Sequence, residues 1–458
     1  MRRYSAFFLI PLAIAMLGAG CGGSSGTTEA AKPVTLNWWG VYEDQDAVQP
    51  LINAYRTQHP NVSIEYRALR SSEYEQALVN ALAEDRGPDI FALHNTWIPK
   101  YQAKLAFVPD SYSVPFTTIE GTVKKIPVTR LVTKQGISIR SLKSTYVDTV
   151  AADVVRPSDE TPAKDRIYAL PLSGDNLALF YNKDLLNLAG IAQPPQFWTE
   201  FQNDVKKLTK QNAQGNIVQS GAGIGTAKNV LRAADILSLL MMQNGARMTD
   251  ENGFAYFQET PPELQGREVP PADEASIFYT DFANPAKEVY TWNDKLADSL
   301  EAFSQGKTAF FLGYSFNIND IRARAPKLNF GIGAAPQIEG NPQVNYANYW
   351  VQAVSKKSKS QNWAWDFVQS MTSAEQAGKY VEAAHTPTVL RSLLGKQLED
   401  VDLSVFANQM LTARAWYRGK NETEMEAAFA ELISAVLNGA DVHRAVVNAV
   451  NRVNESYK

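Results

Sequence analysis

The chain has 458 residues and a formal net charge of −4, with 20% charged and 10% aromatic residues. A chain of this length folds more readily as two compact units than around a single core. Its weakly acidic balance and the lack of a long basic run disfavour nucleic acid as a partner. The only cysteine is Cys21, which excludes an intrachain disulfide.

Residues 1–20 have the pattern of a signal peptide. Two arginines precede an apolar run at 7–17, which is shorter than the ~20 residues that a permanent membrane helix needs. Small residues then lead to Cys21 in an arrangement similar to a bacterial lipobox, and this predicts that Cys21 is acylated. Residues 21–33 consist mostly of Gly, Ser, Thr and Ala and are expected to form a flexible tether.

The next part of the chain alternates between strand and helix patterns. A capping box of Ser72 and Glu75 is expected to open the second helix. The βαβαβ order predicts a parallel sheet whose ligand crevice lies beyond the carboxyl ends of its strands. The expected elements are a strand at 34–39, a helix that ends before Pro60, a strand at 62–66, a helix that ends before Gly87 and a strand at 89–93.

Residues 167–186 read IYALPLSGDNLALFYNKDLL. The pattern predicts two strands separated by Pro171 and a polar turn at 174–176, and then a short helix capped by Asn182 or Asp184. A Pro-Pro pair and an aromatic helix start follow. This ordered series resembles the central signature of the bacterial extracellular solute-binding proteins that include maltose-binding protein, the capture subunits of ABC importers.

The resemblance implies an α/β protein with a two-lobed periplasmic-binding-protein-like fold of type II. In this fold, central mixed sheets are flanked by helices and a ligand cleft lies between the lobes. The resemblance also implies a monomeric binding protein, not an enzyme, that uses no cofactor and delivers its solute to the transmembrane subunits of an ABC permease. The protein would lie outside the cytoplasm, on the outer or periplasmic face of the membrane, held only through Cys21.

Further stretches that resemble the family place the expected lobes along the chain. Residues 303–314 resemble a crossover between lobes, and a strand at 351–354 is expected to cross back. The segment at about 111–140 is an insertion, because members of the family usually have a shorter connection here. It is expected to form an extra hairpin at the cleft rim or a surface for a partner. The expected division is 34–165 for the first part of lobe 1, 166–308 for lobe 2, 309–352 for the return to lobe 1 and 353–458 for C-terminal helices of lobe 2.

Other chemistry receives less support from the sequence. The four histidines show no ligand spacing, which disfavours a transition-metal site, and no G-x-S-x-G motif provides a serine nucleophile. The Gly-rich run at 221–228 fits neither common nucleotide-binding pattern. A glycosidase pair of carboxylates stays open, because the distance between two carboxylates is a property of the folded chain.

Sugar recognition requires flat apolar rings for the C–H face of the sugar and planar amides or carboxylates for its hydroxyl groups. Aromatic residues occur at predicted strand ends and loops that the expected fold brings to the cleft, with polar residues in the same loops. The predicted ligand-binding residues are Trp39, Glu43, Asn95, Trp97, Asp175, Trp292, Tyr314, Tyr349 and Trp350.

These observations favour a lipid-anchored subunit that captures a mono- or oligosaccharide between two lobes. The alternative from a different class is a secreted carbohydrate-active enzyme such as a glycosidase. Within the binding class, the solute could be a polyamine, glycerol phosphate or another polar metabolite. An enzyme would degrade its oligosaccharide during long incubation, whereas a binding protein would leave the oligosaccharide intact.

Overall fold

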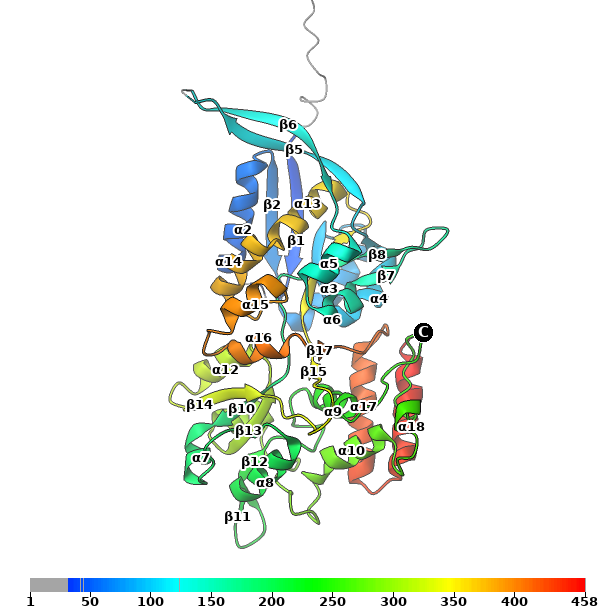
Figure 1. Ribbon diagram of the computed structural model, residues 1–458. Coiled ribbons are helices and arrows are strands. Elements are labelled where there is room, and N and C mark those ends of the chain that lie inside the picture. Colours follow the sequence, from blue (N-terminus) through cyan, green and yellow to red (C-terminus); the bar gives the residue numbers. More distant parts are fainter. Residues whose placement is uncertain (1–31, 42, 44, 123, 458) are drawn as a thin grey trace, which may run out of the picture.

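The structure is a computed structural model that describes residues 32–457 apart from 42, 44 and 123. The chain forms two α/β lobes that follow one another along the long axis of the molecule (Figure 1). The predicted signal peptide, Cys21 and most of the expected tether lie outside the described residues. Among the described residues, no helix combines the length and the apolar character that a membrane crossing requires.

The first lobe is built on a six-stranded sheet. Three strands from the start of the chain pair in parallel, with Trp38 beside Ile90, so the predicted βαβαβ unit is confirmed. A later strand joins them in the antiparallel sense and sets Trp350 opposite His94. The strand order is β2 (Val62–Ala68), β1 (Val34–Gly40), β3 (Ile90–His94), β16 (Trp350–Ser355) and β4 (Leu105–Ala106), with β9 (Ala169–Leu170) also paired to β16.

Helices with one apolar face pack against this sheet. In α2 (Gln45–Gln58), Val48, Leu51 and Tyr55 recur at helical spacing and are buried in the core of the lobe. The other helices of the first lobe are α3 (Ser71–Ala83), α4 (Ile98–Tyr101), α5 (Ile139–Thr145), α6 (Asp148–Val154), α13 (Gln361–Met371), α14 (Ala374–Ala384) and α15 (Arg391–Gln397).

Two predicted helix starts have different outcomes. The capping box of Ser72 and Glu75 is wrong, because α3 is preceded by Arg70 and no side chain caps it. The Glu75 carboxylate instead accepts a hydrogen bond from the Tyr101 hydroxyl at 2.9 Å, so it binds a residue distant in sequence and does not cap the helix. The cap by Asn182 is confirmed, since its side chain accepts hydrogen bonds from two backbone N–H groups of α7 (Lys183–Leu188).

The insertion forms an antiparallel hairpin of β5 (Ser111–Glu120) and β6 (Ile126–Gln135). The expected hairpin is therefore confirmed, but its position differs from the cleft rim that we expected. The hairpin lies at the end of the first lobe that is remote from the second lobe (Figure 1). It is fixed there by Asp366 of α13, which accepts hydrogen bonds from the Tyr112 hydroxyl at 3.1 Å and from Lys134 Nζ at 2.7 Å.

The second lobe contains a five-stranded sheet with its own hydrophobic core. Its strand order is β11 (Lys210–Gln211), β12 (Ile217–Ala222), β13 (Thr308–Gly313), β10 (Ala178–Asn182) and β14 (Phe330–Ala334). The helices around it are α7, α8 (Trp198–Leu208), α9 (Ala233–Gln243), α10 (Pro271–Asp281), α11 (Ser299–Ser304), α12 (Asn317–Arg324), α17 (Glu422–Leu437) and α18 (Val442–Glu455).

The division of the chain between the lobes differs from the expected one. We expected the return to the first lobe at 309–352, but β13 pairs with β10 and β12 inside the second sheet. The chain reaches the first sheet only with β16, and α13 and α14 follow in the core of that lobe. Sheet membership depends on the pairing partner, and the fully buried, mostly apolar strand β13 would fit either core by its own sequence.

Three connections in the described chain join the lobes, at residues 171–177, 347–349 and 398–421. Backbone hydrogen bonds tie them together, from Leu177 N–H to the Tyr346 carbonyl and from Ala347 N–H to the Arg414 carbonyl, both at 3.0 Å. The third connection contains α16 (Ser404–Gln409) and β17 (Ala413–Arg414), and β17 pairs with β15 (Asn345–Tyr346). The lobes therefore meet at a hinge of adjacent crossing segments.

Candidate functional site

A cleft of about 900 Å³ lies between the lobes. Its walls come from the ends of β3 and β16, from the loops after β1, β9 and β13, from the starts of α2, α3, α12 and α17, from the residues before α9, and from α14. The lining residues are Glu43, Asp46, Ala47, Ser71, His94, Trp97, Leu172, Ser173, Gly174, Asp175, Leu231, Arg232, Ser315, Phe316, Asn319, Asn348, Tyr349, Trp350, Tyr380, Ala383, Ala384, His385, Thr386 and Glu422.

The first lobe presents an aromatic wall to the cleft, made of His94, Trp97 and Trp350. The Trp97 and Trp350 rings lie 5.3 Å apart between centroids, and His94 lies 5.7 Å from Trp350, both in edge-on arrangements. The pairing of β3 with β16 sets His94 opposite Trp350 and explains this contact. Trp97 follows in the short 3₁₀ helix Asn95–Trp97 directly after β3.

A carboxylate of the second lobe faces this wall. Glu422 accepts a hydrogen bond from Trp97 Nε1 at 2.7 Å and lies 3.5 Å from His94 Nδ1. Burial raises the pKa of Glu422, but the neighbouring His94 and Arg232 and the bond from Trp97 outweigh that effect and leave this pKa below its ordinary value. The carboxylate is therefore an anion that touches both lobes.

Arg232 approaches the same carboxylate from the second lobe. Its backbone has a φ of 57°, a left-handed conformation that is uncommon for a residue with a side chain. Its guanidinium pairs with Asp235 at 2.7 Å and with Glu426 at 2.9 Å. These two carboxylates hold the cation at the cleft wall, where it can donate to an oxygen-rich ligand.

The polar turn between β9 and β10 also reaches the cleft, as the resemblance implied. Asp175 is buried there and accepts hydrogen bonds from Asn176 N–H, from the Ser315 N–H and from the Ser315 hydroxyl, the last at 2.7 Å. Burial raises the pKa of Asp175 to about 7, although these hydrogen bonds oppose the shift. The turn is thereby joined to the loop after β13.

Five of the predicted site residues line the cleft: Glu43, Trp97, Asp175, Tyr349 and Trp350. The Glu43 carboxylate is held by Gln352 Nε2 at 2.6 Å and by a backbone N–H. Tyr349 is almost fully buried and lies at a strand start beside the aromatic wall.

Two predicted residues of the first lobe lie outside the lining. Asn95 is fully buried behind the wall and donates from Nδ2 to Asp153 at 2.9 Å. Trp39 packs against the core of the lobe with the Arg67 guanidinium 5.1 Å from its ring centroid. Asn95 shares Asp153 with the Tyr349 hydroxyl, so it supports the wall from behind.

Trp292 and Tyr314 also lie outside the lining, because both are completely buried in the core of the second lobe. Trp292 Nε1 donates to Asn229 at 3.1 Å, and the Tyr314 hydroxyl donates to Asp235 at 2.6 Å. Tyr314 therefore orients Asp235, the carboxylate that holds the cleft arginine. Loop position in the sequence does not distinguish such core residues from residues that face a cleft.

The sequence-based site omitted several cleft residues, among them His94, Arg232, Phe316, Tyr380 and Glu422. For His94 a signal existed, since it follows a predicted buried strand at the carboxyl end of a parallel sheet. Glu422 and Arg232 lie at the starts of two helices of the second lobe, and nothing in their local sequence indicates that the two helices converge on one cleft.

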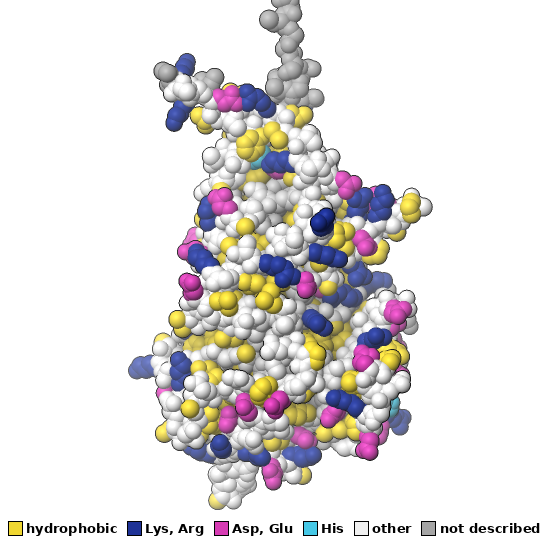
Figure 2. Space-filling view, viewed as in Figure 1, with side chains coloured by type: hydrophobic (Ala, Val, Ile, Leu, Met, Phe, Trp, Pro, Cys, Tyr) yellow, Lys and Arg dark blue, Asp and Glu magenta, His cyan; other side chains and the backbone are white. Residues whose placement is uncertain are grey.

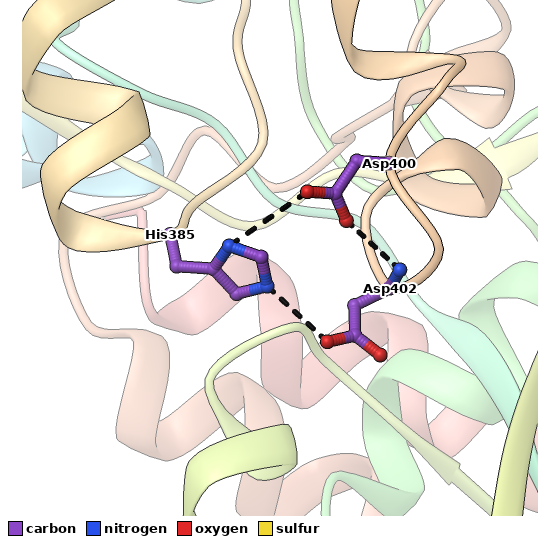
Figure 3. A group of neighbouring side chains, drawn as sticks. All are labelled: His385, Asp400 and Asp402. Atoms are coloured by element: carbon purple, nitrogen blue, oxygen red, sulfur yellow. Dashed lines mark hydrogen bonds and ion pairs between the residues drawn. The ribbon is translucent and has the colours of Figure 1, made fainter.

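His385 forms a cluster with Asp400 and Asp402 at the cleft side of the hinge (Figure 3). His385 Nε2 lies 3.3 Å from Asp402, and its Nδ1 lies 3.9 Å from Asp400. One donor atom from each residue could approach a cation, because these atoms lie within 4.8 Å of one another. Asp402 also pairs with Arg322 of α12 at 2.9 Å, and Asp400 accepts from two backbone N–H groups before α16. The cluster therefore links α14 of the first lobe to α12 of the second.

Two lobes on crossing connections, with an aromatic and charged cleft between them, define a class of proteins that enclose a small solute. Residues 39–378 match the family described as bacterial extracellular solute-binding protein. The chain therefore belongs to this family, whose members bind solutes outside the cytoplasm and are not enzymes.

Solved structures with the same fold cover nearly the whole chain. The cyclic α-maltosyl-1,6-maltose binding protein of Arthrobacter globiformis is 19% identical over 93% of this chain and 99% of that one, with a TM-score of 0.70. The sugar-binding protein MalE of Xanthomonas citri is 18% identical over 92% and 97%, with a TM-score of 0.68. At these identities the likeness shows the fold, which is that of type II periplasmic binding proteins, as predicted.

A curated relative supports the same family. The multiple sugar-binding protein of Streptococcus mutans is 22% identical over 238 residues, which cover 52% of this chain and 54% of that protein. The chain spans about half the length of the curated relatives it matches.

Proposed function

We propose that this chain captures a carbohydrate between its lobes and delivers it to the transmembrane subunits of an ABC importer. The observation that carries the proposal is the aromatic wall of Trp97 and Trp350, which faces the charged side chains Glu422 and Arg232 across the cleft. Indole rings match the C–H face of a sugar, and buried ionised groups pair with its hydroxyl groups. The names of several similar proteins, which describe them as sugar-binding proteins, support the same solute class.

The ligand contacts that we propose combine the sequence prediction with the cleft geometry. Trp97 and Trp350 would stack on the sugar, and Glu43, Asp175 and Tyr349 would border it. We include His94, Arg232 and Phe316 in this proposed set, because they also line the cleft. Phe316 is 49% exposed and stacks on Tyr314 at 5.6 Å, so it offers the second lobe an aromatic surface of its own.

A thermal-shift and calorimetric screen of mono- and oligosaccharides tests the proposed solute class. A sugar that binds only the native state adds about 2.7 kcal/mol of stability at a hundredfold excess over its dissociation constant. Polyamines and glycerol phosphate form the comparison set, because the cleft also contains four carboxylates, of Glu43, Asp46, Asp175 and Glu422. Stabilisation by that set alone would contradict the carbohydrate proposal and keep the binding role.

We also propose that Cys21 carries a lipid that holds the protein at the membrane. The support is the apolar run and the small residues before Cys21. In the Cys21→Ala variant we expect no acylation, with the protein either released or retained with its signal peptide. Detergent extraction and the mass of the N-terminal peptide measure this outcome. Acylated protein in that variant would contradict the anchor.

A further inference from the structure

The β5–β6 hairpin has two unlike faces. In its ladder Pro115 pairs with Leu131 and Ile119 pairs with Pro127, so these residues share one face. Ile119 is 65% exposed and Leu131 is 57% exposed. Val114, on the opposite face, is completely buried against the first lobe. On this outer face Pro115 is buried, whereas Ile119, Pro127 and Leu131 are exposed among Ser and Thr side chains, so the described chain leaves these three apolar side chains uncovered.

The free end of the hairpin is basic. Residues 111–135 contain four basic side chains and a single acidic one, Glu120, which is paired with Arg130. Lys124 and Lys125 are exposed in the turn. Figure 2 shows Lys and Arg side chains gathered over this end of the molecule. A surface that combines exposed aliphatic groups with lysines matches an anionic lipid surface.

The described chain begins at the same end of the molecule. The Lys32 carbonyl accepts a hydrogen bond from Asn61 Nδ2 at 3.1 Å, and nearby His59 Nδ1 lies 2.7 Å from the Pro115 carbonyl of the hairpin. Cys21, the proposed acylation site, precedes Lys32 by eleven residues (32 − 21). A chain of that length spans at most about 40 Å, so an anchor there would keep the hairpin close to the bilayer.

We propose that the outer face and the turn of the hairpin rest on the anionic lipid surface, and that they form a second membrane contact beside the lipid anchor. This inference rests on the lipid-anchoring part of the proposed function. Ile119 and Leu131 lie at the level of the headgroups, and Lys124 and Lys125 pair with lipid phosphates. Two contacts at one end of the first lobe restrict the orientations that the cleft can take above the membrane.

A fluorescent probe on the hairpin tests the contact. A Leu131→Cys variant of the full chain carries an environment-sensitive label, because acylation of Cys21 leaves one free thiol. The protein is bound to vesicles of phosphatidylcholine with phosphatidylglycerol as the anionic component. We expect a blue shift and quenching by brominated acyl chains. The matched control is Leu188→Cys, at a 79% exposed position in the second lobe, where no change is expected.

The lysines of the turn provide a second measurement. Replacing Lys124 and Lys125 by Gln should lower the equilibrium constant for contact of the hairpin with the membrane about thirtyfold, which corresponds to about 1 kcal/mol per lysine. The same change at Lys206 and Lys207 of α8 should have no effect.

Three outcomes would overturn the inference. They are equal responses of the two labels, no response of the hairpin label on anionic vesicles, or a response that requires permease protein in the membrane. The mass of the N-terminal peptide reports acylation in the same sample, and an unacylated Cys21 overturns the inference together with the anchor. Sugar titration of the labelled protein reports the cleft independently, so failure of the contact is distinct from failure of the binding function.

Discussion

Trp97 and Trp292 carry the same side chain in different surroundings. Trp97 borders the cleft, where its indole N–H is bound to a carboxylate of the other lobe. Trp292 is completely buried in the second lobe, where its indole N–H is bound to Asn229. Truncation of the first would remove a proposed ligand contact, whereas truncation of the second leaves a cavity in a packed core.

We therefore expect the two alanine variants to separate affinity from stability. Trp97→Ala should weaken sugar binding by about 2 kcal/mol, or roughly thirtyfold, with a small change in melting temperature. Trp292→Ala should lower the free energy of unfolding by about 3 to 5 kcal/mol, while the protein that remains folded binds normally. Calorimetry and denaturant unfolding of both variants measure the difference. A normal affinity in folded Trp97→Ala protein would remove this residue from the site.

Asp175 predicts a pH dependence of stability. Its pKa of about 7 in the folded protein exceeds that of an unfolded aspartate, so the folded state binds the proton more tightly. Its contribution to the free energy of unfolding is therefore complete below about pH 4 and is lost as the pH rises to about 7, by up to about 4 kcal/mol. Urea unfolding across this range should show the decline in the wild-type protein and not in Asp175→Asn. The matched control is Asp148→Asn, at an exposed carboxylate, which should keep the decline.

Among the elements, the hairpin is tied to the first lobe by a buried carboxylate together with other polar contacts, such as the one between His59 Nδ1 and the Pro115 carbonyl. Asp366 is 1% exposed and accepts a hydrogen bond from Tyr55 at 2.9 Å. It also accepts hydrogen bonds from Tyr112 of β5 and Lys134 of β6, the two strands of the hairpin. Burial raises the pKa of Asp366, but His59 and Lys134 outweigh burial and hold it below its ordinary value. Asp366 therefore remains ionised and tied to the hairpin near neutral pH.

We expect the hairpin to loosen when this carboxylate is neutralised. Because the folded pKa is lowered, the contribution of Asp366 is complete above about pH 4 and is lost as the pH falls through the folded pKa. Asp366→Asn should cost about 3 to 5 kcal/mol, since it leaves a buried polar network incomplete. Hydrogen exchange should show β5 and β6 opening first, both in the wild-type protein at low pH and in the Asp366→Asn variant. Arg130→Met, which removes only an exposed ion pair, should change the free energy of unfolding little and leave the exchange pattern intact.

At the scale of the whole molecule, side chains bridge the two lobes besides the hinge connections. Arg418 lies at the second-lobe end of the third connection, shortly before α17, and its side chain pairs with Asp153 of α6, which is completely buried in the first lobe. Trp97 and Glu422 form a second bridge at the cleft. The relative position of the lobes therefore depends on a small number of polar contacts, and a ligand that touches both lobes can shift it.

We expect Arg418→Met to open the unliganded protein. The change removes one bridge between the lobes and leaves the Asp153 carboxylate uncompensated, so the radius of gyration from small-angle scattering should increase. Saturating sugar should restore the smaller radius, because the ligand favours the closed arrangement. Arg452→Met is the control, since Arg452 pairs with Glu424 and Glu431 within the second lobe. If all four radii of gyration, of the wild-type protein and of the Arg418 variant with and without sugar, were equal, the result would contradict closure by the hinge.

Features that short stretches encode could be predicted from the sequence. The signature at 167–186 indicated the family, the periodic pattern predicted α2, and Asn182 was one of the two residues expected to cap α7. These signals are local because helix periodicity and capping involve residues at most a few positions apart.

The lobe that each strand joins, and the aromatic residues that face the cleft, depend on long-range packing and could not be predicted in this way. β13 joins the second sheet because β10 and β12, distant in sequence, flank it. Trp292 is buried while Trp97 lines the cleft, although the sequence places both at predicted strand ends or in loops. Glu422 meets Trp97 across 325 positions of the chain. Burial and long-range pairing depend on the packing of both lobes, and no local pattern carries that information.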